Sequence, residues 1–181
     1  MAYRTQVRLG VKAPPAAVWA AMADFDQWAD WNPYYVKAGG RMAIGAEIEL
    51  VRMLGGVAAP ETGAIVDWVP DEQLVWRRKA GLFAQTIAYI EIDGLAPTAC
   101  ILTVGEIFDG LIGRHVSKRR RRLLKAGLTA LGEALKARAE AQWDGTPDET
   151  VVPIPPVHVN PKAKKTKGPM QMSVFGRRGP Q

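Results

Sequence analysis

The carboxylate of Glu106 lies in a segment that is otherwise apolar. Alternation along residues 98–108 puts it on one face with Leu102, Val104 and Phe108. A carboxylate among apolar neighbours either takes up a proton or finds a cation, because an unpaired buried charge is costly. Arg120 falls within the apolar arc of a predicted helix and is the candidate partner. We therefore expect Glu106 and Arg120 to face each other across a cavity; the alternative is a solvated Glu106 near a strand end.

Aromatic side chains form the second candidate group. Trp and Tyr combine a large apolar area with one polar atom, which suits a pocket for a mainly apolar ligand, although any single one is more often a core residue. The turn at Asn32–Pro33 would hold Trp31 near the mouth of such a pocket. The candidate ligand-binding residues are Trp31, Tyr35, Trp68, Trp76, Tyr89, Glu106, Phe108, Arg120 and Leu124.

Other reactive constellations are not found in the sequence. The two histidines, His115 and His158, are not part of any set with metal-ligand spacing. No nucleophile elbow, P-loop or dinucleotide-binding fingerprint occurs. Cys100 lies in an apolar run and is more typical of a small buried hydrophobe than of a nucleophile. We predict no metal and no cofactor.

Some of the candidate ligand-binding residues lie on one long predicted helix. Residues 114–143 predict one helix, and its apolar arc includes Leu124, Leu128, Leu131 and Leu135. Arginines fill residues 119–122 in the early turns of this helix, where each opposes the helix dipole by about 0.3–1 kcal/mol near the end itself. This placement suggests a later helix start or an anionic partner, and a solvated basic face remains the simpler interpretation.

The segments before that helix predict strands and two short helices. Residues 5–12 alternate as a strand, residues 16–23 favour a helix, and Asp24 or Asp26 could cap a second helix that carries Trp28. Turns at Gly39–Gly40, Gly55–Gly56 with Pro60, Pro70–Asp71 and Asp93–Gly94 separate the later segments. The predicted strands there are 34–37, 46–53, 63–69, 73–79, 85–92 and 98–108. Segregated strands and helices indicate an α+β fold.

Composition divides the chain into residues 1–143, a folded domain, and residues 144–181, which we expect to be a disordered basic tail. The tail holds seven of the thirteen prolines and a lysine cluster at residues 162–167. The net charge of +6 is more typical of a solvated face and a basic tail than of a nucleic-acid-binding domain. One cysteine and the lack of a secretory signal or membrane-length apolar run favour the cytoplasm.

Several short motifs occur in a recognisable order: Ala-Pro-Pro-Ala-Ala-Val-Trp at 13–19, Asp-Phe at 24–25, Trp-Asn-Pro at 31–33, Leu-Val-Trp at 74–76 and Glu-Ile-Phe-Asp-Gly-Leu at 106–111. With the order of elements, they resemble the START-like (SRPBCC) superfamily, especially its polyketide cyclase/dehydrase branch, over residues 3–140. The resemblance implies a helix-grip fold, in which a curved antiparallel sheet wraps around the long C-terminal helix and leaves a cavity. A histidine often found two residues before the glutamate is Val104 here.

Three functions are compatible with these features. The first is binding of a small hydrophobic or amphipathic molecule in the cavity. The second is a cyclase/dehydratase-like enzyme in which Glu106 acts as general base and Arg120 or Tyr89 steadies an enolate. The third is a module that docks on an acidic partner, or contacts a membrane peripherally, through the basic helix start and tail. We favour binding, because the sequence lacks the family's histidine and a second carboxylate on the Glu106 face; monomer and homodimer both remain open.

Overall fold

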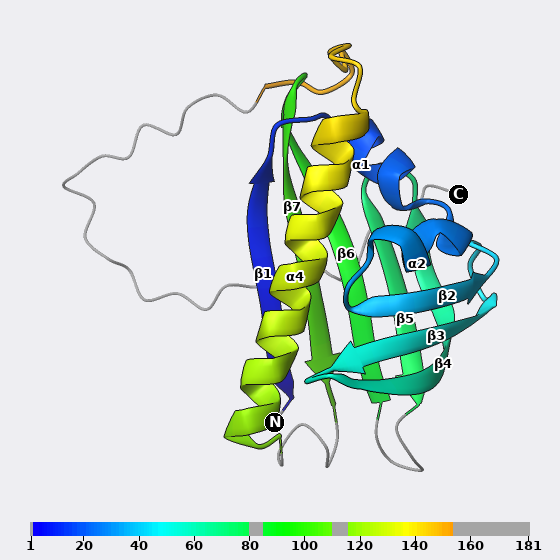
Figure 1. Cartoon of the computed structure of the whole chain (residues 1–181). Helices are drawn as coiled ribbons and strands as arrows, with labels where there is room; N and C mark the ends of the chain where they lie inside the picture. The colour runs from blue at the N-terminus through cyan, green and yellow to red at the C-terminus, as the bar shows by residue number, and fades with distance from the viewer. Residues whose placement is uncertain (1, 80–84, 110–115, 154–181) are drawn as a thin grey trace.

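The computed structural model describes residues 2–79, 85–109 and 116–153, and in it a curved antiparallel sheet wraps around one long helix (Figure 1). The sheet has seven strands in the order β1-β7-β6-β5-β4-β3-β2. The strands are β1 (Tyr3–Val11), β2 (Tyr35–Gly40), β3 (Glu47–Leu54), β4 (Val57–Val69), β5 (Gln73–Lys79), β6 (Gln85–Ala96) and β7 (Ala99–Phe108). The helices are α1 (Pro15–Met22), the short 3-10 helix η1 (Phe25–Gln27), α2 (Trp28–Trp31) and α4 (Lys118–Gln142). The predicted helix-grip architecture is confirmed.

The core lies between the concave face of the sheet and α4. Along β7 the inward residues are those of the predicted face, Leu102, Val104, Glu106 and Phe108, and all are buried. The alternation of side chains along a strand produces this division into an inner and an outer face. The same alternation on the neighbouring strands gives the inner face its remaining apolar residues, among them Ile48, Leu50, Ile65, Leu74, Trp76, Ile90 and Ile92.

Helix α4 buries one stripe and spans the sheet beside β1. Ser117 caps it by accepting a hydrogen bond from the backbone N–H of Arg120 at 3.2 Å. The buried stripe contains Leu124, Leu128, Leu131 and Leu135 of the predicted arc, together with Gly132 and Ala139. Because β1 is an edge strand, its outer backbone groups need other partners: Lys125 donates to the carbonyl of Gln6 at 2.5 Å, and the N–H of Lys12 donates to Glu140 at 2.8 Å.

The short helices close one end of the grip. Pro15 lies in the first turn of α1, where backbone N–H groups have no intrahelical acceptor, so its missing N–H costs no hydrogen bond. The predicted cap of the next helix is Asp24, whose carboxylate accepts from the N–H of Asp26 at 3.0 Å and so begins η1. Helix α2 ends at Trp31, before Asn32–Pro33, as the restricted conformation of a residue before proline predicts.

Three strands are longer than predicted, because glycine and proline did not end them. Strand β2 includes Gly39–Gly40, and β6 continues through Asp93–Gly94 to a register shift between Gly94 and Ala96. Strand β4 includes Pro60, which pairs with Val51 of β3, whereas the pairing of β4 with β5 begins only at Gly63. Among the described strands Pro60 therefore has no second neighbour, and its missing N–H breaks no ladder.

Residues 144–153 return toward the sheet. The N–H of Asp148 donates to the carbonyl of Pro97 at 2.8 Å, and the indole N–H of Trp143 donates to the carbonyl of Thr146 at 2.9 Å. Contacts with the domain thus continue past the predicted boundary at residue 143. The predicted disordered tail, residues 144–181, thus begins with a segment that makes contacts, and its remainder, residues 154–181, lies outside the described residues, as do Arg114 and His115.

Candidate functional site

Glu106 is completely buried and holds the centre of a polar cluster on the concave face. Its exposed fraction is 0%. One carboxylate oxygen accepts hydrogen bonds from Tyr34 at 3.2 Å, from Tyr35 at 2.9 Å and from Arg78 at 2.8 Å. The other accepts from Arg52 at 3.3 Å. Four donors, two of them on guanidinium groups, therefore satisfy the oxygens of this buried carboxylate.

Two carboxylates and two guanidinium groups form a closed ring of ion pairs. Arg52 binds Glu106 and also Glu61, the latter at 2.6 Å, and Arg78 binds the same two carboxylates. The ring joins β3, β4, β5 and β7, which supply one residue each. Its charges cancel, so the inside of the grip holds four charged groups without a net charge.

Asn32 positions the two tyrosines of the cluster. Its side-chain oxygen accepts from the backbone N–H groups of Tyr34 at 3.0 Å and Tyr35 at 2.8 Å, and it thereby fixes the turn that leads from α2 into β2. Burial raises the pKa of both hydroxyls, and the negative charge of Glu106 raises it further. Both tyrosines are therefore neutral hydrogen-bond donors at physiological pH.

The two arginines keep their charge. Burial alone would lower the pKa of each guanidinium, but the pKa of Arg52 is raised because Glu106 lies beside it. The pKa of Arg78 is raised in the same way by Tyr35, Glu106 and Glu61 against the effect of burial. These buried side chains are thus fixed cationic donors.

An aromatic wall adjoins the polar cluster. The ring of Tyr35 lies 5.6 Å from that of Trp76 and 5.9 Å from that of Trp28, centroid to centroid. Trp28 also contacts Trp76 at 6.2 Å and Trp31 at 5.9 Å. The wall therefore continues from Tyr35 to the half-buried Trp31. There the guanidinium of Arg138, a residue of α4, lies 5.9 Å from the centroid of the Trp31 ring.

Several buried donors in and around the grip have no acceptor. Buried polar groups usually find a partner, so each such atom needs an explanation. Within the described residues the side-chain atoms in this state are all N–H donors: Trp31 Nε1, Asn32 Nδ2, Arg52 Nε, Trp68 Nε1, Trp76 Nε1 and Arg78 Nε. Four of them, on Arg52, Arg78, Trp76 and Trp31, belong to the polar cluster or to the wall beside it. The inner surface is therefore short of acceptors rather than of donors.

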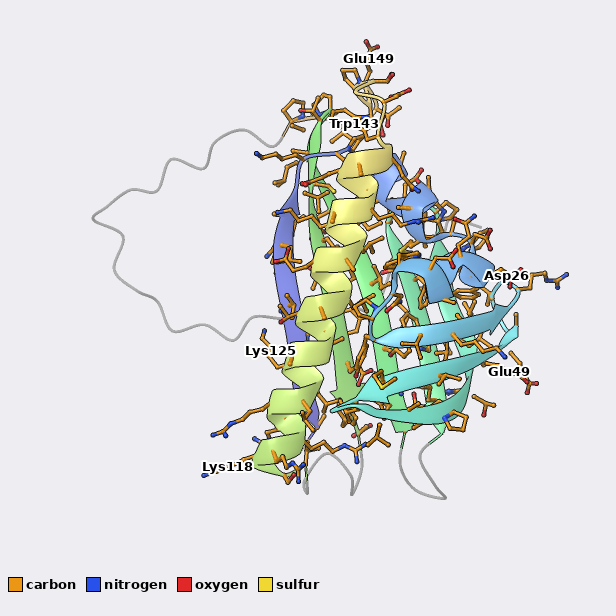
Figure 2. All side chains as sticks on the ribbon, viewed as in Figure 1. Asp26, Glu49, Lys118, Lys125, Trp143 and Glu149 are labelled. Carbon is orange, nitrogen blue, oxygen red and sulfur yellow. The ribbon has the colours of Figure 1, made fainter. Side chains whose placement is uncertain are left out.

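The predicted pairing of Arg120 with Glu106 is wrong. Arg120 is exposed in the first turn of α4, and Leu124 is the first residue of that helix to be buried. The apolar arc therefore does not extend to Arg120. Figure 2 shows the Lys118 end of α4 at the opposite extreme of the helix from Trp143. The cations that hold Glu106 come instead from β3 and β5.

The prediction that Tyr89 lines the cavity is also wrong. Tyr89 follows Ala88, which pairs with Glu106, so its side chain points to the opposite face of the sheet. There its hydroxyl donates to the side-chain oxygen of Gln6 at 2.9 Å and accepts from Arg4 at 3.0 Å. Tyr89 is thus a buried residue of the convex face.

The structure places the remaining predicted residues at three separate locations. Tyr35, Trp76 and Glu106 come together as described, and Trp31 lies at the end of their wall. Trp68 lies beside Trp19 of α1, at 6.4 Å between ring centroids. Phe108 and Leu124 pack in a separate small cluster with Val116, toward the start of α4. Only part of the predicted set therefore shares one site.

Sequence reasoning missed Arg52, Arg78, Tyr34 and Glu61. The signal for the two arginines was present, because each continues the inward alternation of its strand, after Leu50 in one case and after Trp76 in the other. It is the same signal that identified Glu106: a charge on an apolar face. No comparable pattern identified Tyr34 or Glu61.

The interior at the polar cluster is closed. Trp28, Trp76, Tyr34, Tyr35 and Phe108 are among the largest fully buried side chains. Among the pockets formed by described residues, one lies over β2–β4 and reaches Leu50 and Glu61, one runs along the exposed side of α4, and one lies between α1 and residues 142–148. In the described part of the chain, no three His, Cys, Asp or Glu side chains are grouped so that they could hold a metal ion. Nor is any helix there long and apolar enough to cross a membrane.

Comparisons with known proteins agree with the fold. The model of a family described as polyketide cyclase / dehydrase and lipid transport matches residues 4–140. The Zhui aromatase/cyclase from Streptomyces sp. R1128 is 17% identical, with a TM-score of 0.65 over 77% of this chain and 94% of that one. A START superfamily protein from Mycobacterium smegmatis is 18% identical, with a TM-score of 0.61 over 77% and 98%.

A truncated norcoclaurine synthase from Thalictrum flavum is 11% identical, with a TM-score of 0.60 over 75% of this chain and 92% of that one. No curated protein sequence matches the chain. At these identities the solved structures show a shared helix-grip fold, and the activities of those proteins do not transfer with it.

Proposed function

Because this chain belongs to the polyketide cyclase / dehydrase and lipid transport family, we propose that it binds a small amphipathic molecule between its sheet and α4. The observation that carries the proposal is the set of buried donors without acceptors beside an aromatic wall. A buried donor without a partner costs about 1–3 kcal/mol. A ligand whose oxygen atoms accept these hydrogen bonds recovers that free energy, while its apolar part lies against aromatic rings.

The cluster suits recognition by fixed donors. Arg52 and Arg78 are charged, and hydrogen bonds from charged donors are roughly twice as strong as those between neutral groups. The indole N–H of Trp76 adds a donor within the apolar wall. Since the interior is closed, binding requires side chains at its margin to move aside.

Binding without chemistry is favoured over the cyclase alternative. A general base needs a free lone pair near the proton that it removes and a pKa near the working pH. The oxygens of Glu106 already accept from four donors. The hydroxyls of Tyr34 and Tyr35 have a pKa raised above the ordinary tyrosine value by burial. The two tyrosines are therefore not poised as acids at neutral pH, and three donors already occupy one oxygen of Glu106.

Calorimetric titration with naphthylmethanol, a neutral amphipathic probe, tests the proposal. We expect saturable binding to the parent protein. The variant Trp76→Phe keeps an apolar ring and removes one unpartnered donor, so its affinity should fall by about fivefold or more. Trp143→Phe is the matched control, because its indole N–H bonds to Thr146 at the far end of α4, and its affinity should not change.

Absence of saturable binding by the parent protein would overturn the proposal. So would an equal loss of affinity in the two tryptophan variants, because the inner wall would then have no special part in binding. Native mass spectrometry of freshly purified protein provides an independent measurement, in which a co-purified small molecule is expected as added mass on the folded protein and not on the denatured chain.

A further inference from the structure

Glu61 is the member of the ion-pair ring nearest to solvent. Its side chain is 18% exposed, compared with 0% for Glu106, 5% for Arg78 and 7% for Arg52. The two carboxylates thus bind the same pair of guanidinium groups from opposite sides, Glu106 from the depth of the sheet and Glu61 from its margin.

The two carboxylates are held by very different numbers of donors. Glu106 accepts from both arginines and from Tyr34 and Tyr35, whereas Glu61 has the two arginines as its partners within the described residues. Breaking the contacts of Glu61 therefore disturbs only its half of the ring. Of the two carboxylates, it is the one that can be exchanged.

Glu61 lies at the margin of the described sheet. Residues 57–62 of β4 pair with β3, and the pairing of β4 with β5 starts at Gly63. Among the described strands, Glu61 therefore has β3 as its one paired neighbour. Its side chain can turn outward, into the water that it already partly reaches, without breaking a β4–β5 backbone pairing, although it gives up its ion pair with Arg78 of β5.

Charge decides what can take its place. With Glu61 turned away, Arg52 and Arg78 have Glu106 as their one remaining counter-ion. The buried site then has a net charge of +1. A buried unpaired charge is unfavourable, so an anionic group is favoured over a neutral one. The free Nε–H groups of both arginines offer further donors to such a group, and a planar guanidinium binds a carboxylate through two parallel hydrogen bonds.

We infer that the ligand is an amphipathic carboxylate, whose carboxylate replaces that of Glu61 between Arg52 and Arg78 while its apolar part lies against Trp76 and Tyr35. This inference rests on the proposed function and names its ligand class. Glu61 is then an internal competitor that holds the two arginines in place until an anionic ligand arrives.

The test compares naphthoate with naphthylmethanol, which share an apolar ring system and differ in charge. Glu61→Gln keeps the shape of the side chain and removes the competing charge. In calorimetric titrations we expect naphthoate to bind this variant about tenfold or more tightly than the parent, because each tenfold step reflects about 1.4 kcal/mol. The affinity for naphthylmethanol should change by no more than about twofold on the same scale.

Glu49→Gln is the matched control, because it makes the same change in net charge at an exposed residue of β3 (Figure 2). If naphthoate gains as much affinity in this variant as in Glu61→Gln, the effect is one of overall charge and the inference is overturned. It is also overturned if Glu61→Gln tightens both probes equally, since the gain would then come from easier opening. Failure of both probes to bind the parent and the variant would instead refute the proposed function itself.

A measurement on the unmodified protein covers the case in which Glu61→Gln does not fold. Nuclear magnetic resonance observes arginine side-chain Nε–H groups directly, and Arg52→Lys and Arg78→Lys assign the two buried signals. Saturation with naphthoate should shift both signals, because its carboxylate takes the place of Glu61 between the two guanidinium groups. Saturation with naphthylmethanol leaves Glu61 in place and should shift them less. Two signals that do not move at saturation with naphthoate would overturn the exchange.

Discussion

At the scale of single residues, Glu106 and its donors are the most constrained group in the described structure. A buried ion pair adds little net stability, because desolvation offsets the attraction, but the removal of one partner leaves the others uncompensated. Because of this asymmetry, a substitution that removes one charge of the cluster should destabilise the protein. A substitution of an exposed cation such as Arg120 should not.

Glu106→Ala should therefore destabilise the protein by about 3–5 kcal/mol, since it leaves Arg52 and Arg78 buried with only Glu61 as counter-ion. Arg120→Ala, at an exposed position, should change the free energy of unfolding by less than about 0.5 kcal/mol. Urea denaturation measures both. Similar losses in the two variants would contradict the ring and restore the pairing that the sequence suggested.

The tyrosines predict how stability depends on pH. Burial raises the pKa of Tyr35, whereas in the unfolded chain the hydroxyl ionises near its ordinary pKa of about 10. Above that pH the unfolded chain releases a proton that the folded protein retains, so the free energy of unfolding decreases as the pH rises. Below it the contribution is fully present.

Tyr35→Phe removes this titrating group, so the free energy of unfolding should fall less steeply from about pH 9 to about pH 11 in the variant than in the parent. Its stability near neutral pH should be lower, because Glu106 loses a donor at 2.9 Å. Urea midpoints across this range give both quantities. Parallel curves would mean that Tyr35 has no raised pKa in the folded protein.

At the scale of elements, the contact between α4 and the polar cluster depends on Gly127. A Cβ atom at this position would come within 2.4 Å of the ring of Tyr34, which is itself fully buried. The ring cannot retreat without disturbing its hydrogen bond to Glu106. Gly127 thus lets the helix approach the cluster closely.

Gly127→Ala should destabilise the protein, although alanine favours a helix by about 1 kcal/mol over glycine. Overpacking typically costs about 1–3 kcal/mol, so the balance is a loss. Thr129→Ala, on the exposed side of α4, provides the control and should have little effect. Thermal unfolding of the two variants decides the matter, and a gain in stability from Gly127→Ala would show that the ring can move away freely.

At the scale of the whole molecule, the segment that follows α4 is the last part of the described chain to contact the sheet. Asp148 bonds to Pro97, and a Cβ added at Gly94 would meet Val151 at 2.9 Å, so the segment as far as Val151 packs on the β6–β7 end of the sheet. The composition of residues 154–181, rich in proline and lysine, offers little apolar surface for burial.

Removal of residues 154–181 should leave the melting temperature within about 4 °C of the parent value, which corresponds to less than about 1 kcal/mol for a domain of this size. Removal of residues 145–181 should lower it further, because it also takes away the contacts of Asp148 and Val151. Calorimetry on the two truncated chains measures the difference. Equal melting temperatures would mean that the segment 145–153 contributes nothing to the fold.

The sequence by itself determined the order of the elements, the buried stripe of α4 from Leu124 onward, and the inward direction of Glu106. These are local properties: alternation along a strand and the helical repeat set which side chains share a face. The same local rules placed turns at Gly39–Gly40 and Asp93–Gly94, where the strands in fact continue, because pairing with neighbouring strands outweighed the local preference of glycine.

Only the tertiary structure decided which residues meet Glu106. Its partners lie 72, 71, 54 and 28 positions away along the chain, on β2, β3, β5 and the turn before β2. Alternation fixes the face of a residue but not the register between strands or the curvature that brings their inner faces together. The first turn of α4 carries Arg120 on the extension of the apolar arc, yet the packed part of the helix begins one turn later. Contacts of long sequence separation depend on how the whole sheet closes around the helix, and no local pattern encodes that closure.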